Sequence, residues 1–194
     1  MGNAFVLRLI RHAPTAGNVR KAYIGWTDEP ILPFEIKPDY GIRCIWGSDL
    51  LRCRQTAHIL FPNACYKADF NLRELNFGDW ENMTYDDLRS NERYRNWIDD
   101  PEAVQPPNGE SLPQLAERVD RAIEVFSEIG DFTVVTHGGP IRYILSKAKR
   151  QHFFSQQAAH GFCYTVTWAS KSAYKEGHPC VSYSAEPLTV NASM

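Results

Sequence analysis

The hydrophobic and polar positions of this chain form runs of two kinds, which predict strands alternating with helices. Residues 4–10 are almost entirely apolar, as is typical of a strand buried on both faces of a parallel sheet. Residues 42–46 and 132–136 are shorter runs of the same kind, and we expect two further strands there. Residues 162–168 alternate between apolar and polar positions, which predicts a strand that pairs with a run at 181–184.

Helical spacing follows several of these strands. Ser48 is the expected N-cap of a helix that presents one apolar stripe. This stripe consists of Leu50, Cys53, Ala57 and Leu60. Ser111 and Gln114 match a capping box and predict a second helix. Its stripe consists of Leu115, Val119, Ala122, Phe126 and Ile129. Two more helices are expected, one over residues 84–98 and one from Pro140 through residue 145.

Strands that alternate with helices predict an α/β fold, a three-layer sandwich with a mostly parallel central sheet flanked by helices. The length of 194 residues and the 43% hydrophobic content fit a single domain that spans residues 1–194. Residues 100–108 are rich in proline and predict a loop that can cover a site, rather than a linker between domains.

The net charge and the cysteine content limit the binding partners and the cellular compartment that we expect for this chain. The formal net charge of -2 provides no general attraction to nucleic acid or to an acidic membrane, so an anion site requires a local basic cluster. The five cysteines are an odd number and form no Cys-x-x-Cys pair, which predicts reduced thiols. No basic segment precedes the apolar residues 5–7, and no stretch is long enough to span a bilayer. We therefore expect a cytoplasmic protein.

Basic and glycine residues stand where the expected strands end. Arg11 and His12 follow the first strand, Arg52 lies in the helix after the second, and His137 and Gly138 follow the run at 132–136. Ligands of open α/β sheets bind beyond the carboxyl ends of the strands, so these side chains are expected to converge. Guanidinium groups and helix N-termini together bind phosphate, which predicts an oxyanion site.

Two histidines at a phosphate site allow phosphoryl transfer to nitrogen. One imidazole attacks phosphorus through a neutral ring nitrogen, while the second imidazole and the arginines stabilise charge on the phosphoryl oxygens. The leaving alkoxide needs a proton, which a carboxylic acid kept protonated by the incoming dianion can supply. Glu74 and Glu81 are the candidates for this acid. The scheme needs neither a metal nor another cofactor. Each residue alone is an ordinary surface or core residue, and the prediction depends on the ordered set.

These motifs resemble those of a known family, the histidine phosphatase superfamily with its phosphoglycerate-mutase-like fold. Residues 11–15, together with Asn18, resemble the Arg-His-Gly motif and the asparagine that follows it. The resemblance implies that His12 accepts the phosphoryl group and that Arg11 and Asn18 contact it. Residues 48–57 resemble the family segment whose arginine binds phosphate, which by this alignment is Arg52.

The remaining motifs occur in the order of the family. Residues 72–81 are similar to its acid-bearing stretch, which implies that Glu74 is the proton donor and leaves Glu81 as a secondary candidate. Residues 134–139 resemble the motif of the second histidine, which implies that His137 and the Gly138 N–H contact the phosphate.

Within the superfamily, residues 23–30, 77–81 and 108–111 look most like the α-ribazole-phosphate phosphatase branch of cobalamin synthesis. Tyr23 and Trp26 can stack on a flat substrate such as a benzimidazole. The resemblance implies hydrolysis of a small-molecule phosphomonoester such as α-ribazole-5'-phosphate. The alternatives are a broad-specificity phosphatase for sugar phosphates or phosphoserine and a phosphoglycerate mutase-like enzyme. The chain lacks the longer inserts and tail of the mutases, which favours transfer to water.

Two departures from the family pattern stand out. Ala13 replaces the glycine after the nucleophile, and its methyl group would strain the loop if that position required positive φ or close backbone approach. Residues 31–41 are too short and too rich in proline for the amphipathic helix usual there. Sheet surface exposed at that place can be covered by another subunit, so a homodimer is one expected state.

Two other interpretations stay open. His12, His137 and a carboxylate can be ligands of a divalent metal in a hydrolase, although nearby arginines would repel the cation and no His-Glu-x-x-His pair is present. A degenerate family member that binds phosphorylated ligands without turnover is the second. The remaining histidines match no motif and are interpreted as structural or solvated. They are His58, His152, His160 and His178.

Overall fold

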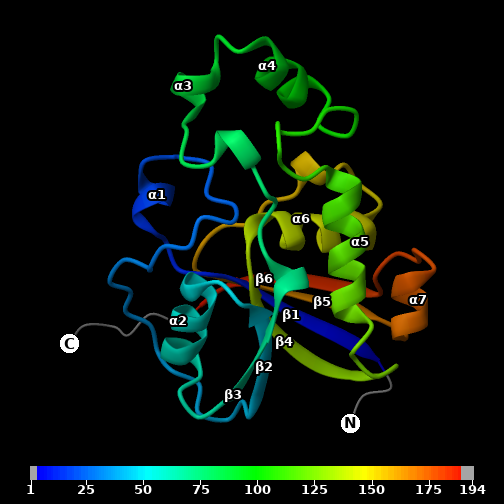
Figure 1. Cartoon of the computed structure of the whole chain (residues 1–194). Coiled ribbons are helices and arrows are strands. Elements are labelled where there is room, and N and C mark those ends of the chain that lie inside the picture. Colours follow the sequence, from blue (N-terminus) through cyan, green and yellow to red (C-terminus); the bar gives the residue numbers. More distant parts are fainter. Residues whose placement is uncertain (1–3, 189–194) are drawn as a thin grey trace.

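Six strands form one sheet in the order β3-β2-β4-β1-β5-β6 in the computed structural model, which describes residues 4–188 (Figure 1). The strands are β1 (Phe5–Arg11), β2 (Cys44–Ser48), β3 (Cys65–Asp69), β4 (Gly130–Thr136), β5 (Phe162–Trp168) and β6 (Ser182–Pro187). The four strands β3, β2, β4 and β1 are mutually parallel, and β5 and β6 extend the sheet in antiparallel pairing. The mostly parallel α/β sheet expected from the sequence is confirmed.

Helices cover both faces of this sheet. The longer ones are α2 (Leu51–Leu60), α4 (Glu92–Asp99), α5 (Leu112–Ile123) and α6 (Gly138–Lys149). Short helices are α1 (Ala16–Val19), α3 (Tyr85–Leu88) and α7 (Lys171–Lys175), with 3-10 turns η1 (Phe70–Leu72), η2 (Gly78–Trp80) and η3 (Phe153–Ser155). The segment that contains α3 and α4 stands at the top of the molecule, away from the sheet, with α1 beneath it (Figure 1). No helix among residues 4–188 has the length and apolar character needed to cross a bilayer.

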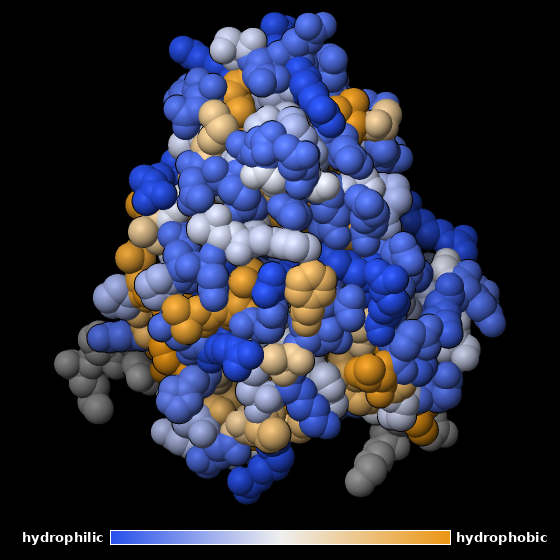
Figure 2. Space-filling model, in the orientation of Figure 1, coloured by the Kyte–Doolittle hydropathy of each residue, from blue (hydrophilic) through white to orange (hydrophobic). Residues whose placement is uncertain are grey.

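Alternate residues of β1 serve two hydrophobic cores. Phe5, Leu7 and Leu9 are fully buried in the larger core, which includes apolar residues of α5 and α6. Ile10 belongs to the smaller core on the other face, with Ile45 and residues of α2. This alternation follows from the opposite orientation of successive side chains along a strand, and it produces the three layers. The face of the molecule shown in Figure 2 is mostly hydrophilic, with apolar groups between the polar ones.

Three local predictions were wrong. Ser48 ends β2 and caps no helix, because α2 begins only after Leu50. Residues 84–98 form two helices instead of one, since Asn91 caps α4 by accepting a hydrogen bond from the backbone N–H of Tyr94. Ile129 lies beyond the end of α5 and is 47% exposed. The capping box at Ser111 is present, and the other apolar stripe positions of both helices are buried, although Phe126 also lies beyond the end of α5.

Residues 31–41 contain no helix, as the sequence predicts. The segment is extended, and its Ile36 is 5% exposed and packs in the smaller core with Ile10 and Ile45. The chain therefore covers part of the sheet face that the missing helix would occupy. A hollow of about 620 Å³ beside Ile36 and Phe61 remains open on this face.

A buried ion pair fixes the chain between η1 and the acid stretch. Arg118 of α5 makes two hydrogen bonds to Glu110, of 2.6 and 2.7 Å, and both side chains are almost completely buried. The same guanidinium donates to the backbone carbonyls of Asn71, Arg73 and Glu74 at 2.6–2.9 Å. One side chain of α5 thus holds the backbone of the strand-to-loop segment that carries Glu74.

Replacing Arg118 by alanine should lower the free energy of unfolding by about 3–5 kcal/mol, because the Glu110 carboxylate would stay buried without its partner. The matched control is Arg121→Ala, which removes an exposed pair with Glu117 on the same helix and should cost at most about 1 kcal/mol. Urea denaturation measures both values. Equal losses for the two variants would contradict the role assigned to Arg118.

Candidate active site

The parallel pairing of β1 and β4 places the two motif histidines side by side. Arg11 is in register with Thr136, so His12 and His137 each follow the end of their strand at the same level. The backbone N–H of His12 donates to the carbonyl of Thr136 at 2.9 Å. The two imidazole rings are 5.0 Å apart between centroids and inclined at 62°, and both side chains are buried.

The hydrogen bonds of His12 determine which ring nitrogen is free. Its Nδ1 lies 2.7 Å from the carbonyl oxygen of Ala13, which can only accept, so Nδ1 carries the hydrogen and Nε2 keeps its lone pair. Burial lowers the pKa of His12 well below its usual range, and the Arg52 and Arg11 charges lower it further. His12 is therefore a neutral imidazole whose Nε2 keeps its lone pair.

Arg52 sets the opposite tautomer of His137. Its Nε donates to Nδ1 of His137 at 3.2 Å, so the hydrogen of this imidazole is on Nε2. Burial and then the Arg52 charge keep the pKa of His137 well below its usual range. The Arg52 side chain is fully buried and also donates to the carbonyls of Gly25 at 2.6 Å and Thr27 at 2.8 Å. His137 is thereby a neutral N–H donor.

Arg11 and the start of α6 complete a set of donors for an anion. Arg11 donates from Nη1 to the carbonyl of Ala158 at 2.7 Å, whereas its Nε is buried and has no hydrogen-bond partner among residues 4–188. A Cβ atom at Gly138 would lie 3.5 Å from Cζ of Arg11 and 3.4 Å from Oε2 of Glu74. The first residues of α6 therefore face both groups, and the backbone N–H of Gly138 and the helix dipole favour an anion there.

Glu74 is held beside the N-terminus of α6. Its Oε1 accepts hydrogen bonds from the backbone N–H groups of Leu75 at 2.9 Å and Gly139 at 2.8 Å, and the residue is only 8% exposed. A Cβ atom at Gly139 would collide with this carboxylate, so glycine is needed at that position. The other carboxylate oxygen, Oε2, lies toward Gly138 and Arg11 and is free for chemistry.

Glu81 lies in a different environment. Its carboxylate accepts hydrogen bonds from the backbone N–H groups of residues 25–27 and of Phe77, and from the hydroxyl of Thr27. Most of these hydrogen bonds anchor the 25–27 loop, whose carbonyls in turn hold Arg52. Glu81 thus supports the position of Arg52 and is not placed beside His12.

The other expected substrate contacts separate into different environments. Asn18 forms a capping box with Thr15 at the start of α1, through its side-chain oxygen. Trp26 donates from its indole to the carbonyl of Glu74 at 3.0 Å and packs against Phe70. Tyr23 lines the hollow beside Glu74, with its hydroxyl 2.6 Å from that of Tyr94.

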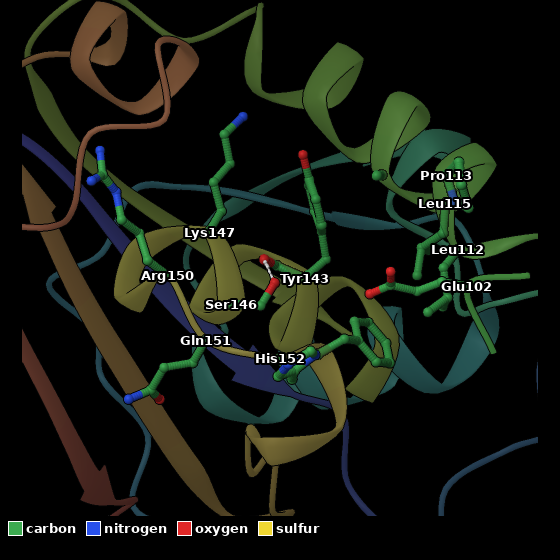
Figure 3. A pocket seen from close by; sticks show the side chains of 12 residues that line it. Glu102, Leu112, Pro113, Leu115, Tyr143, Ser146, Lys147, Arg150, Gln151 and His152 are labelled. Carbon is green, nitrogen blue, oxygen red and sulfur yellow. Dashed lines mark hydrogen bonds between the residues drawn. The ribbon is translucent and has the colours of Figure 1, made fainter. Parts of the chain in front are cut away.

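An aromatic hollow of about 330 Å³ adjoins Glu74. It is lined by Tyr23, Phe77, Trp97, Ile98, Gly139, Arg142, Phe153 and Phe154, together with Glu74 and Leu75. Sequence reasoning missed Arg142, although its i+4 spacing from Gly138 places it on the same helix face. A separate hollow of about 500 Å³ lies between α5 and α6, with Tyr143 and Lys147 in its wall, and contains none of the motif residues (Figure 3).

Ala13 does not strain the nucleophile loop. The residues with positive φ other than glycine are Lys21, Asn82, Asn108 and Arg150 within residues 4–188. Ala13 is buried, and its N–H donates to the hydroxyl of Thr56 at 2.8 Å. An ordinary backbone conformation therefore accommodates the methyl group in place of the family glycine.

The donor set favours an anion over a cation. Arg11 and Arg52 flank the two imidazoles, and one lone pair of His137 is already used by Arg52. Across residues 4–188, no group of three or more histidine, cysteine, aspartate or glutamate side chains is arranged to hold a metal ion.

Comparison with known proteins shows which family this chain resembles. The model of the histidine phosphatase superfamily (branch 1) matches residues 7–176. "Probable phosphoglycerate mutase GpmB" of Yersinia pestis is 31% identical over 155 residues, which are 71% of this chain and 72% of that protein. The solved structure of TTHB049 from Thermus thermophilus has a TM-score of 0.69 and 26% identity, covering 96% of this chain and all of the other.

A further solved structure, the alpha-ribazole phosphatase from Shigella flexneri, has a TM-score of 0.71 at 19% identity. It covers 98% of this chain and 100% of its own, and at this identity it shows a shared fold. The motifs, the sheet and the match over residues 7–176 lead to one conclusion: the chain belongs to the histidine phosphatase superfamily, branch 1.

Proposed function

We propose that this chain is a metal-independent phosphomonoester hydrolase that forms a phosphohistidine on Nε2 of His12. The observation that carries the proposal is the hydrogen bond from Nδ1 of His12 to the carbonyl of Ala13, since it leaves the lone pair on Nε2. In the first step Nε2 attacks phosphorus and the ester P–O bond breaks. In the second step water attacks phosphorus, the P–N bond breaks, and phosphate leaves.

The surrounding residues stabilise charge and move protons in this scheme. Arg11, Arg52 and the imidazole of His137 stabilise the phosphoryl oxygens, where charge spreads in the transition state. The free oxygen of Glu74 donates a proton to the leaving alkoxide, and the same carboxylate then takes a proton from the attacking water. Gly138 contributes its backbone N–H to the phosphate.

The proposed substrate is a small-molecule ester whose leaving group enters the aromatic hollow beside Glu74, and α-ribazole-5'-phosphate is the first candidate. Its flat benzimidazole suits walls formed by residues such as Tyr23, Trp97 and Phe154. Likeness in fold to the Shigella protein supports this choice, which would place the enzyme in cobalamin synthesis. The five cysteines are all free thiols, which supports a cytoplasmic location.

A mutase is the second candidate function, favoured by the 31% identity to the Yersinia protein. A mutase differs only in the acceptor of the phosphoryl group, a substrate hydroxyl in place of water. Product analysis with 3-phosphoglycerate separates the two functions, because hydrolysis releases inorganic phosphate and mutase activity releases an isomeric ester.

The purified chain should hydrolyse p-nitrophenyl phosphate in the presence of EDTA, and His12→Ala should lower the rate by about 10³-fold or more because the nucleophile is lost. The exposed His58→Ala is the matched control and should keep full activity. A panel of α-ribazole-5'-phosphate, sugar phosphates and phosphoserine ranks the substrates by kcat/KM. Inhibition by EDTA would support a metal hydrolase, and absence of turnover with every ester would support a binding protein.

Glu74→Gln should slow hydrolysis of alkyl phosphates by about 10²–10⁴-fold and that of p-nitrophenyl phosphate much less, because only a poor leaving group needs the proton. Glu81→Gln weakens the anchor of the 25–27 loop and should therefore slow both esters by the same factor. Rates for a series of leaving groups distinguish the two variants. If the leaving-group dependence changed with Glu81→Gln instead, Glu74 would not be the acid.

Activity should persist on acidification, because the lowered pKa of His12 keeps its imidazole neutral and nucleophilic below pH 6.5. The imidazole of His137 also stays neutral on acidification, because its pKa is lowered as well. The acid limb of kcat/KM, corrected for ionisation of the substrate, should therefore have its midpoint well below 6.5. A midpoint at the ordinary histidine value would mean that the nucleophile titrates as an exposed imidazole.

A further inference from the structure

The chain between η3 and β5 makes direct hydrogen bonds to the active-site groups. The carbonyl of Ala158 accepts the bond from Arg11, and the carbonyl of Gln156 accepts one from Nε of Arg142 at 3.2 Å. His160, which matches no family motif, lies at the end of this segment. Its Nδ1 is 2.6 Å from the backbone carbonyl oxygen of His12. A third histidine therefore contacts the nucleophile residue.

The contact of His160 with His12 has two parts. A carbonyl oxygen can only accept, so Nδ1 of His160 carries the hydrogen and donates it. The two rings also meet edge to face, 5.2 Å apart between centroids and inclined at 69°. The position of His160 is itself fixed, because the preceding Ala159 donates its N–H to the hydroxyl of Tyr164 at 2.7 Å.

The peptide between His12 and Ala13 is where this bond acts. Its oxygen accepts from His160, and its N–H, that of Ala13, donates to Thr56. These two hydrogen bonds, one at the C=O and one at the N–H of the peptide, prevent its rotation. The next carbonyl, that of Ala13, orients the His12 ring through Nδ1, so rotation of the first peptide would change the direction of Nε2.

His160 can donate this bond without adding charge to a site that already contains two arginines. Burial and the neighbouring Arg11 lower the pKa of His160 to about 4, against the smaller opposing effect of its bond to His12. A protonated His160 would repel the neighbouring guanidinium of Arg11, one of the groups proposed to bind phosphate.

We propose that His160 is a positioning residue for the nucleophile. By holding the backbone carbonyl of His12, it directs Nε2 of the His12 ring. This inference rests on the proposed function of His12. A shift of the attacking nitrogen affects the reaction step much more than binding, because the phosphate is bound chiefly by the arginines and the α6 N-terminus.

Three variants separate the hydrogen bond from the packing of the ring. His160→Ala removes both, His160→Phe keeps a ring without a donor, and His160→Asn places an amide N–H near the position of Nδ1. We expect kcat for p-nitrophenyl phosphate to fall about tenfold or more in the first two variants, with KM changed less than about twofold. His160→Asn should recover most of kcat. Exposed His178→Asn is the matched control and should match the wild type.

Rapid-quench measurement of the phosphorylated protein should show that formation of phosphohistidine slows in parallel with kcat. Thermal melting of each variant identifies any that fails to fold, and the Phe and Asn variants then decide the question. Equal kcat in all three variants and the wild type would overturn the proposal, as would equal loss in Phe and Asn, or a change in KM alone. The His12→Ala variant distinguishes failure of the proposed function from failure of this inference. If His12→Ala stays active, the proposed function itself is wrong. If His12→Ala is inactive but His160→Phe has normal kcat, only the role of His160 is rejected.

Discussion

The parallel pairing of β1 with β4 is the constraint on which the site depends. Seven residue pairs hold the two strands in register, and the last pair lies directly before the two histidines. A slip of one residue would turn each strand's side chains to the opposite face and would separate the rings. The fully buried Leu9 and Val134, paired across the two strands, disfavour such a slip because the shifted register would move them from the larger core to the smaller one.

Around this pair, the protein binds positive charge with main-chain carbonyls more than with carboxylates. Arg52 and Arg118 are both buried, and together they contact five backbone oxygens. A carbonyl satisfies a guanidinium hydrogen without cancelling its charge. Arg52, held by two carbonyls and an imidazole, therefore keeps a positive field suited to an anion, while the backbone bonds of the two arginines fix the 25–27 loop and the acid stretch. Burial, and then this field, lower the pKa of both imidazoles and keep them neutral.

Much of this arrangement was accessible from the sequence, because strand ends are marked by abrupt changes from apolar runs to Arg, His and Gly. The structure brings together Arg11, His12, Arg52, Glu74 and His137, although their catalytic roles remain predictions. The strand β3 was not predicted, since its residues Cys65–Asp69 are mostly polar and it forms an edge of the sheet. The supporting bonds of Glu81, Arg118 and His160 were also missed, because each joins segments that are far apart in the sequence and leaves no periodic pattern.

The two ends of the site are built from different parts of the chain. The two motif histidines follow central strands, whereas four residues that line the aromatic hollow belong to α4 and η3, namely Trp97, Ile98, Phe153 and Phe154. Substitutions at these four positions leave the strand ends untouched, so the group that fits the hollow can change while the residues at the strand ends stay in place. Descendants of one ancestral scaffold can in this way diversify their metabolic roles by exchanging surface segments, without passing through an inactive intermediate.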